Sequence, residues 1–396
     1  MKYKTEIIQA VLFIVTLITT TLAGAEAMTA KAFFFFPEPY LLHFPEDFWQ
    51  GFQFSIPFLA FLTCHEFGHY FTARYYNIKT SLPYYIPMWL SVLTDIGIGT
   101  LGAVIRITGK TRSRKQYFDI GIAGPLAGFV VALGVLYYGF THLPPFEHIF
   151  TVHPDYQQFG RNYPTEVMKI PKFMNNQLVL GDNLLFKFFK NYVADPALLP
   201  PNFEIMHYPL IWAGYLALFF TALNLFPIGQ LDGGHILYGL IGKKKFNIIS
   251  PIIFIGFTFF AGYGMFTIAD IKNIGPTGYY KSESDFFTWL LGYVLFLRIC
   301  FSRISENQLT SWVLSLSVIV AQFLLSYIPS LASIQGFSGF FPFLFLLGRF
   351  LGIYHPEVEI DEPLDFKRHL LGWLSLLIFI LCFTPYPFMQ IDFSAK

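Results

Sequence analysis

A short pattern with the spacing of a metal site lies between Phe61 and Tyr70: His-Glu-x-x-His, formed by His65, Glu66 and His69. On a helix, residues four positions apart lie on one face, so the two imidazoles can hold one zinc ion. Glu66 then stands beside the metal, where it can take a proton from a water molecule whose pKa the metal has lowered, and pass it to a leaving amine. The pattern predicts metal-assisted hydrolysis with Glu66 as general base.

The surroundings of this pattern are apolar. Between residues 52 and 72, the only acidic, basic, histidine or thiol side chains are these three and Cys64. The run is long enough to cross a bilayer, and ionisable side chains at such a depth are costly and by default functional. The alternative interpretation is a set of buried polar groups that satisfy one another across a helix bundle.

The composition is that of a membrane protein. Of the 396 residues, 54% are hydrophobic, 20% are aromatic and only 13% are charged, whereas soluble chains carry about 25% charged residues. The net charge of +1 and the absence of a basic tail give no indication of a nucleic-acid partner. Cys64, Cys300 and Cys382 all fall in apolar segments and do not form a disulfide framework.

The predicted fold class is an all-α polytopic membrane protein with about nine transmembrane helices, a membrane re-entrant β-hairpin and a zinc site within the helical core. The predicted spans are 7–25, 52–75, 118–141, 207–228, 246–269, 286–302, 309–328, 336–353 and 369–386. The first could instead be a signal peptide cleaved at Leu22-Ala23-Gly24-Ala25. Its apolar part is longer than usual for one, which favours a retained helix.

Basic residues gather in alternate loops, and this sets the expected orientation. With a cytoplasmic N-terminus, the inner segments collect most Lys and Arg residues, including those from Arg106 to Lys115. At about 1.5 Å per residue, His65 then lies roughly 20 Å below the outer end of its helix, in the inner part of a bilayer core about 30 Å thick. We expect a multi-pass protein, with a bacterial inner membrane preferred over an organelle membrane.

The inner segment before the third span is unusual because its middle, residues 90–108, is largely apolar. Glycines at 97, 99 and 102 precede an alternation of apolar residues up to Ile107, which predicts a short strand or hairpin that re-enters the membrane. It could be an edge strand that pairs with an unwound substrate segment, or a packing plug beside the bundle. Asp95 could line an entry or simply face water.

Two further stretches complete the core. Small residues from Gly121 to Gly128, around Pro125, open the third span and predict close helix packing. The following outer loop, residues 143–206, is rich in Pro, Phe, Tyr and Asn and could fold over the outer face, but it contains no repeat.

A second motif, Asn224-x-x-Pro227-x-x-x-x-Asp232-Gly233, ends the fourth span. Two histidines leave a catalytic zinc short of one protein ligand. Asp232 is the only acid between Glu204 and Asp270 and lies at a broken point of an apolar helix, so we expect it to be the third ligand.

Two neighbours of Asp232 have open roles. Asn224 could hold the substrate backbone or a developing oxyanion, or could form an interhelical hydrogen bond. His235 could be a rival ligand, but a supporting group or a satisfied core histidine is the preferred interpretation.

Together the two motifs resemble the site-2 protease family of intramembrane zinc metalloproteases, peptidase family M50. The run Ser81-Leu-Pro-Tyr-Tyr-Ile-Pro87 and the small-residue helix are similar to its subgroup that lacks a PDZ domain and includes chloroplast members. The resemblance implies a three-helix core, Zn2+ held by His65, His69 and Asp232, and Glu66 as general base. It also implies cleavage of transmembrane segments of membrane-protein substrates, often of a regulator after a first cut elsewhere.

The resemblance divides the chain into three parts. Residues 1–51 form a first transmembrane helix and an outer loop, residues 52–242 the catalytic core, and residues 243–396 additional C-terminal transmembrane helices. The expected partners are a membrane-protein substrate and the lipid bilayer; no pattern indicates an oligomeric state.

Two alternative functions could use part of this pattern. A prenyl-protein endopeptidase also uses a membrane His-Glu-x-x-His, but it would be expected to take its third ligand from a Glu. A metal-ion transporter or metal-binding protein could use His65, His69 and Asp232 as a transit site. The acid beside His65, and the lack of further acids and histidines through the other spans, argue against transport.

Overall fold

The computed structural model describes residues 4–33, 41–89, 97–170, 177–275 and 278–391. The chain is mostly helical and forms two compact units, one of Met1–Leu225 with Trp373–Lys396 and the other of Phe226–Gly372. Helix α16 (Phe366–Cys382) crosses the boundary between them. The functional division into a catalytic core and added helices stays a prediction.

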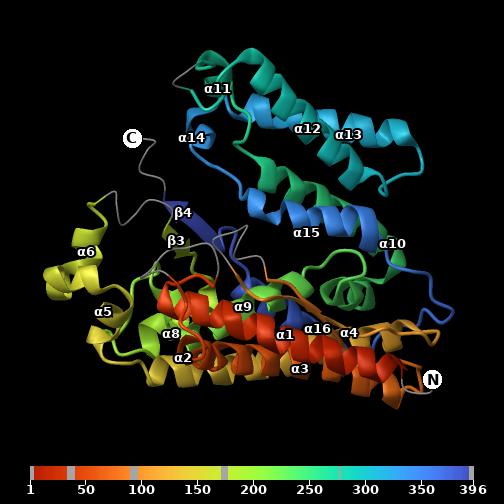
Figure 1. Cartoon of the computed structure of the whole chain (residues 1–396). Coiled ribbons are helices and arrows are strands. Elements are labelled where there is room, and N and C mark those ends of the chain that lie inside the picture. The colour runs from red at the N-terminus through yellow and green to blue at the C-terminus, as the bar shows by residue number, and fades with distance from the viewer. Residues whose placement is uncertain (1–3, 34–40, 90–96, 171–176, 276–277, 392–396) are drawn as a thin grey trace. The chain divides into compact units, whose positions relative to one another are not determined.

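The first unit is built on four long helices: α1 (Lys4–Thr29), α3 (Phe52–Tyr75), α4 (Arg114–Thr141) and α9 (Pro209–Asn224). Helices α1, α3 and α4 run side by side, and α9 packs on α3 and α4 (Figure 1). The remaining helical elements are α2 (Glu46–Gln50), η1 (Phe146–His148), α5 (Ile149–Val152), η2 (Pro154–Asn162), α6 (Tyr163–Val167), α8 (Leu184–Tyr192) and η3 (Ile205–His207).

Small residues set the distances between these helices. A Cβ atom on Gly68 of α3 would lie 2.5 Å from the carbonyl oxygen of Ala123 in α4. On the other side of α4, a Cβ atom on Gly214 of α9 would lie 2.5 Å from Leu136. The first contact is to backbone and leaves room only for glycine, whereas the second would require the Leu136 side chain to shift. The helices thus have the close packing that the small residues predict.

Two antiparallel strand pairs complete this unit. Strand β1 (Tyr84–Pro87) pairs with β2 (Thr100–Val104), and β3 (Gln177–Leu180) pairs with β4 (Phe388–Ile391). Strand β2 lies inside the predicted hairpin segment 90–108, but its partner lies upstream of that segment. Residues 90–96, with Asp95, lie outside the described residues, and the re-entrant position of the pair stays a prediction.

The second unit contains three long helices: α10 (Asp232–Gly262), α12 (Glu283–Phe301) and α13 (Gln308–Leu325). Helix α10 is broken at Gly242, whose φ is 75°. The shorter elements are α11 (Ile268–Lys272), α14 (Pro329–Ala332), η4 (Ser338–Phe340), α15 (Phe341–Phe345) and the π-helical η5 (Leu346–Leu351).

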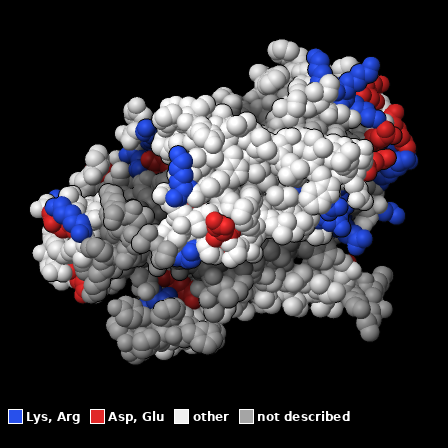
Figure 2. Space-filling model, turned by 90° about the horizontal axis from the view of Figure 1, so that it is seen from above, with Lys and Arg blue, Asp and Glu red and all other residues white. Residues whose placement is uncertain are grey.

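Polar residues face inward and apolar residues outward on several helices, the reverse of a soluble protein. On α13 the buried positions include Ser311, Ser315 and Gln322, whereas the exposed face carries Leu309, Val313, Leu316, Val320 and Leu324. Helix α1 buries Gln9, Thr16, Thr20 and Thr21 and exposes Ile7, Val11, Ile14 and Ile18. Figure 2 shows, among the described residues, a broad area with few acidic or basic side chains and charged groups toward its margins. Such faces suit a lipid environment.

Each of the nine predicted spans contains helical residues, and five of the helices that the structure describes are long and apolar enough to cross a membrane. These five are Thr5–Thr29, Arg114–Thr141, Asp232–Gly262, Glu283–Phe301 and Gln308–Leu325. Pro209–Asn224 and Ser338–Leu351 are shorter apolar helices. The chain is therefore an integral membrane protein, whereas the number of crossings stays a prediction.

The inward polar face generates a stability prediction. The side-chain amide of Gln322 donates to the carbonyl of Phe259, 2.8 Å away, and to the hydroxyl of Tyr293, 3.1 Å away. Replacing Gln322 by Leu removes both hydrogen bonds at similar side-chain size, and we expect a loss of about 1 kcal/mol. Thermal unfolding in detergent measures this loss of stability. Val320→Leu, on the outward face of the same helix, serves as control; equal losses in both variants would contradict the assignment of the two faces.

Candidate metal centre

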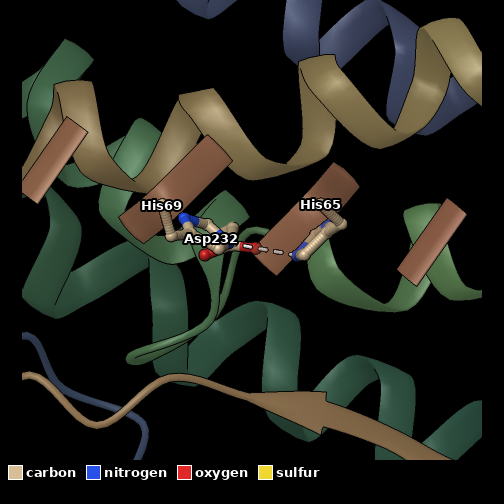
Figure 3. A group of neighbouring side chains, drawn as sticks. All are labelled: His65, His69 and Asp232. Atoms are coloured by element: carbon tan, nitrogen blue, oxygen red, sulfur yellow. Dashed lines mark hydrogen bonds between the residues drawn. The ribbon is translucent and has the colours of Figure 1, made fainter. Parts of the chain in front are cut away.

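Helix α3 presents the three residues of the first motif in a buried position. His65, Glu66 and His69 expose only 3%, 6% and 7% of their surfaces. The helix places the two histidines one turn apart, with their Nε2 atoms 3.1 Å from each other. Figure 3 shows both side chains on the same side of α3. The two imidazoles therefore converge as helical spacing requires.

A hydrogen bond fixes which nitrogen of His69 carries its lone pair. The Nδ1–H of His69 donates to the carbonyl oxygen of Ile120 in α4, at 2.7 Å. Since the proton of the neutral ring lies on Nδ1, Nε2 is left with its lone pair pointing toward His65. Metal-binding histidines characteristically donate their second ring N–H in this way, which orients the ring and raises its basicity as a ligand.

Glycines of α4 make room for these rings. A Cβ atom on Gly124 would lie 2.1 Å from Nε2 of His69, and one on Gly128 would lie 3.1 Å from the Cβ atom of His65. The first distance is far below any real contact, so an alanine at 124 would take the place of the imidazole. Helix α4 thus provides both the space for the His69 ring and the carbonyl that orients it.

Asn224, near the end of α9, lies next to the first histidine. Its side-chain nitrogen is 3.5 Å from Nε2 of His65, although 159 positions separate the two residues in the chain. The distance is at the long limit of a hydrogen bond. The amide is therefore close to the converging imidazoles and keeps the capacity to donate elsewhere.

Asp232 is the first residue of α10 in the second compact unit, and it follows a tight turn. In that turn the Gly229 N–H donates to Oγ of Ser250, 3.0 Å away, and φ of Gly229 is +58°. A Cβ atom on Gly234 would lie 2.3 Å from the carbonyl oxygen of Gly229, so the turn packs closely on the helix that follows. Asp232 is drawn as a labelled side chain in Figure 3. A carboxylate at this end of a helix is favoured by the helix dipole.

His235 has a partner within the second unit. Its Nδ1 lies 2.9 Å from Nε2 of His355, and the His355 ring stacks on Tyr238 with 3.7 Å between ring centroids. This pairing favours the interpretation of His235 as a satisfied core histidine.

The residues of α3 fit a zinc ion. Two ligands of tetrahedral zinc, each about 2.0–2.1 Å from the metal, are separated by about 3.4 Å, and the two Nε2 atoms are 3.1 Å apart. Both rings are buried, and the lone pair of at least one is directed by the hydrogen bond at its other nitrogen.

The structure also brings together three potential ligands that the sequence patterns did not predict: His153, Glu204 and His207. Only the spacing Glu-x-x-His at the last two could have signalled them, and it lies in a loop with no recognisable repeat.

The glycine of α4 yields a direct prediction. Gly124→Ala should displace the His69 ring and abolish zinc binding at this site, which metal analysis of the purified protein measures. Gly134→Ala is the matched control, because a Cβ atom at Gly134 of the same helix meets nothing within 4 Å. Normal zinc content in Gly124→Ala would show that the site does not depend on this approach of α4.

The family model described as "Peptidase family M50" matches residues 53–265, more than half of the chain. A probable zinc metalloprotease EGY2, chloroplastic, of Oryza sativa subsp. indica is 31% identical over 193 residues, which are 49% of this chain and 30% of that protein. A probable zinc metalloprotease EGY1, chloroplastic, of Arabidopsis thaliana is 28% identical over 187 residues, 47% and 29% of the two chains. The chain thus spans less than a third of the length of these curated relatives. No solved structure matches. The family predicted from the two motifs is confirmed: this integral membrane protein belongs to peptidase family M50.

Proposed function

We propose that this protein is an intramembrane zinc metalloprotease that hydrolyses peptide bonds in or near transmembrane segments of membrane-protein substrates. The observation that carries the proposal is the buried pair of converging imidazoles on α3, with Glu66 between them in the chain. Membership of peptidase family M50 and relatives named as probable zinc metalloproteases support it.

We assign His65, His69 and Asp232 as the protein ligands of one zinc ion. The two histidines supply neutral nitrogen donors, and a carboxylate at the start of α10 supplies the third, charged donor. Bound there, zinc would polarise the scissile carbonyl and lower the pKa of a water molecule. Three protein ligands leave one position for the reacting groups, as catalytic zinc sites require.

The chain's own groups move the proton and hold the substrate. The carboxylate of Glu66 takes the proton from the attacking water and gives it to the nitrogen of the leaving amine, so that the carboxylate is regenerated in each cycle. The side-chain N–H groups of Asn224 donate to the substrate carbonyl oxygen as negative charge develops on it. Burial of Glu66 excludes bulk water from these steps.

The proposal extends to how the chain lies in the membrane. We propose about nine crossings, a cytoplasmic N-terminus and a bacterial inner membrane, although the relatives described above are named chloroplastic. Residues 7–25 would be a retained helix, because Oγ1 of Thr21 lies 2.9 Å from Oγ of Ser55 and Oγ1 of Thr19 donates to the carbonyl of Gly99 at 2.7 Å. Strand β2, which pairs only with β1 among the described strands, would pair along its other edge with an extended substrate segment.

Glu66→Gln separates metal binding from catalysis. The variant should retain zinc, since Glu66 is not a ligand, and should cleave single-span test substrates at least about 100-fold more slowly, because it has lost its general base. Asp232→Ala should lose the zinc ion of this site and activity together. Metal content and cleavage are measured on the same detergent preparations. Undiminished cleavage by Glu66→Gln would contradict the mechanism, and full zinc content in Asp232→Ala would contradict the ligand set.

Asn224→Leu tests the role of the amide. Loss of an oxyanion donor should lower kcat by about 10²- to 10³-fold with little change in zinc content or unfolding temperature. A purely structural interhelical hydrogen bond would give the opposite result: a lower unfolding temperature with normal kcat of the folded protein. Kinetics and thermal unfolding on one preparation distinguish the two.

A further inference from the structure

A second group of converging ligand atoms lies in the first compact unit, in the segment between α4 and α9. Nε2 of His153 lies 3.1 Å from Nε2 of His207. The carboxylate oxygen Oε2 of Glu204 lies 3.4 Å from Nε2 of His207 and 3.6 Å from Nε2 of His153. All three atoms therefore face one another across a space the size of one ion.

Local structure explains why these side chains meet. Glu204 precedes η3 and His207 ends it, and in a 3₁₀-helix of three residues per turn the side chains at i and i+3 lie one above the other. His153 follows α5, and its ring stacks on that of Tyr156 with 4.7 Å between centroids. Tyr156 belongs to a small hydrophobic core with Ile149, Tyr163, Val167 and Phe203. The segment thus has its own packed core, which holds the histidine in place.

The tautomer of His207 suits a metal ligand. Its Nδ1–H donates to the carbonyl oxygen of Ala27, near the end of α1. The lone pair of the neutral ring is therefore on Nε2, the atom directed at Glu204 and His153. The same arrangement orients His69 through the carbonyl of Ile120, and it is typical of histidines that bind metals.

An ionised carboxylate at Glu204 would be compensated by a bound cation. The side chain is fully buried, and neither of its oxygens accepts a hydrogen bond from the residues that the structure describes. Its ion-pair partners there are the two imidazoles. Neutral imidazoles bring only nitrogen lone pairs and N–H groups to this carboxylate and supply no positive charge. A buried carboxylate without compensation is strongly unfavourable.

The distances match a tetrahedral ion. Zinc bound by nitrogen and oxygen at about 2.0–2.1 Å separates neighbouring ligands by about 3.4 Å, and the three observed separations are 3.1, 3.4 and 3.6 Å. Two imidazoles and one carboxylate are a set of ligands that commonly binds zinc in proteins. We propose that His153, Glu204 and His207 bind a second zinc ion, separate from the site on α3.

This ion would connect three parts of the first unit. His153 belongs to the loop after α4, Glu204 and His207 to the turn that leads into α9, and the Ala27 carbonyl to α1. Binding would therefore stabilise the fold of the loop and fix the start of α9. Three protein ligands leave a fourth position that a water molecule can occupy, since His153 is about a quarter exposed.

The test isolates this site by removing the one on α3. The full-length protein carrying His65→Ala and His69→Ala is purified in detergent, and its zinc content and the visible spectrum of its cobalt(II)-substituted form are measured. We expect about one zinc per chain and the intense bands of tetrahedral cobalt. Adding Glu204→Gln or His153→Ala should remove both signals. Adding His142→Ala, an exposed histidine of the same segment, should change neither.

The choice of glutamine at position 204 guards against a loss of zinc that is caused by misfolding. Glutamine keeps the size of the side chain and can hydrogen-bond to an imidazole, so a metal-free cluster would tolerate it without loss of stability. With bound zinc, chelation should lower the unfolding temperature of the His65→Ala/His69→Ala protein and leave that of its Glu204→Gln derivative unchanged. Zinc that persists in Glu204→Gln and His153→Ala, or that is absent before they are introduced, would overturn the proposal. Neither result bears on the protease function, which the Glu66 and Asp232 variants test.

Discussion

Helix α4 approaches α3 so closely at Gly124 that a Cβ atom there would lie 2.1 Å from Nε2 of His69. The same helix supplies the carbonyl of Ile120 that accepts the Nδ1–H of that ring. The space for the His69 ring and the tautomer of that ring therefore depend on one helix contact. The position of Asn224 also depends on α4. Helix α9 packs closely on α4 at Gly214 and Leu136, and α9 brings Asn224 next to His65.

The distribution of polar groups follows from the same packing. In a lipid environment apolar side chains gain nothing by turning inward, so helices associate through small residues and interhelical hydrogen bonds. The buried faces of α1 and α13 are accordingly rich in Thr, Ser and Gln, and their exposed faces in Ile, Leu and Val. The buried Glu66 and its two histidines are the extreme case of this inward polarity. They are tolerated at such a position if a cation compensates the carboxylate.

The two pairs of histidines in the first unit share a physical design. In each pair the Nε2 atoms are 3.1 Å apart, and one ring donates its Nδ1–H to a backbone carbonyl of another element. They differ in the carboxylate that we propose for each. Glu204 is three residues from His207 on a short turn, so all three side chains of that group belong to one unit. Asp232 begins a helix of the other unit, after a turn held by Ser250.

The sequence alone determined the features that depend on local periodicity. His65 and His69 share a face because a helix repeats every 3.6 residues, and helices occupy the predicted spans because long apolar runs must satisfy their backbone internally. The two motifs together were specific enough to predict the family, which the match over residues 53–265 confirms.

Only the tertiary structure decided which distant residues meet. The contact of Asn224 with His65 spans 159 positions, and that of His207 with Ala27 spans 180. Strand β2 pairs with the upstream segment Tyr84–Pro87. Apolar alternation alone does not determine this pairing, because it also depends on how α1 and α3 position the two segments. The cluster of His153, Glu204 and His207 was invisible in the sequence for the same reason: a loop without periodicity folds through its own small core, and no local pattern encodes which side chains that core brings together.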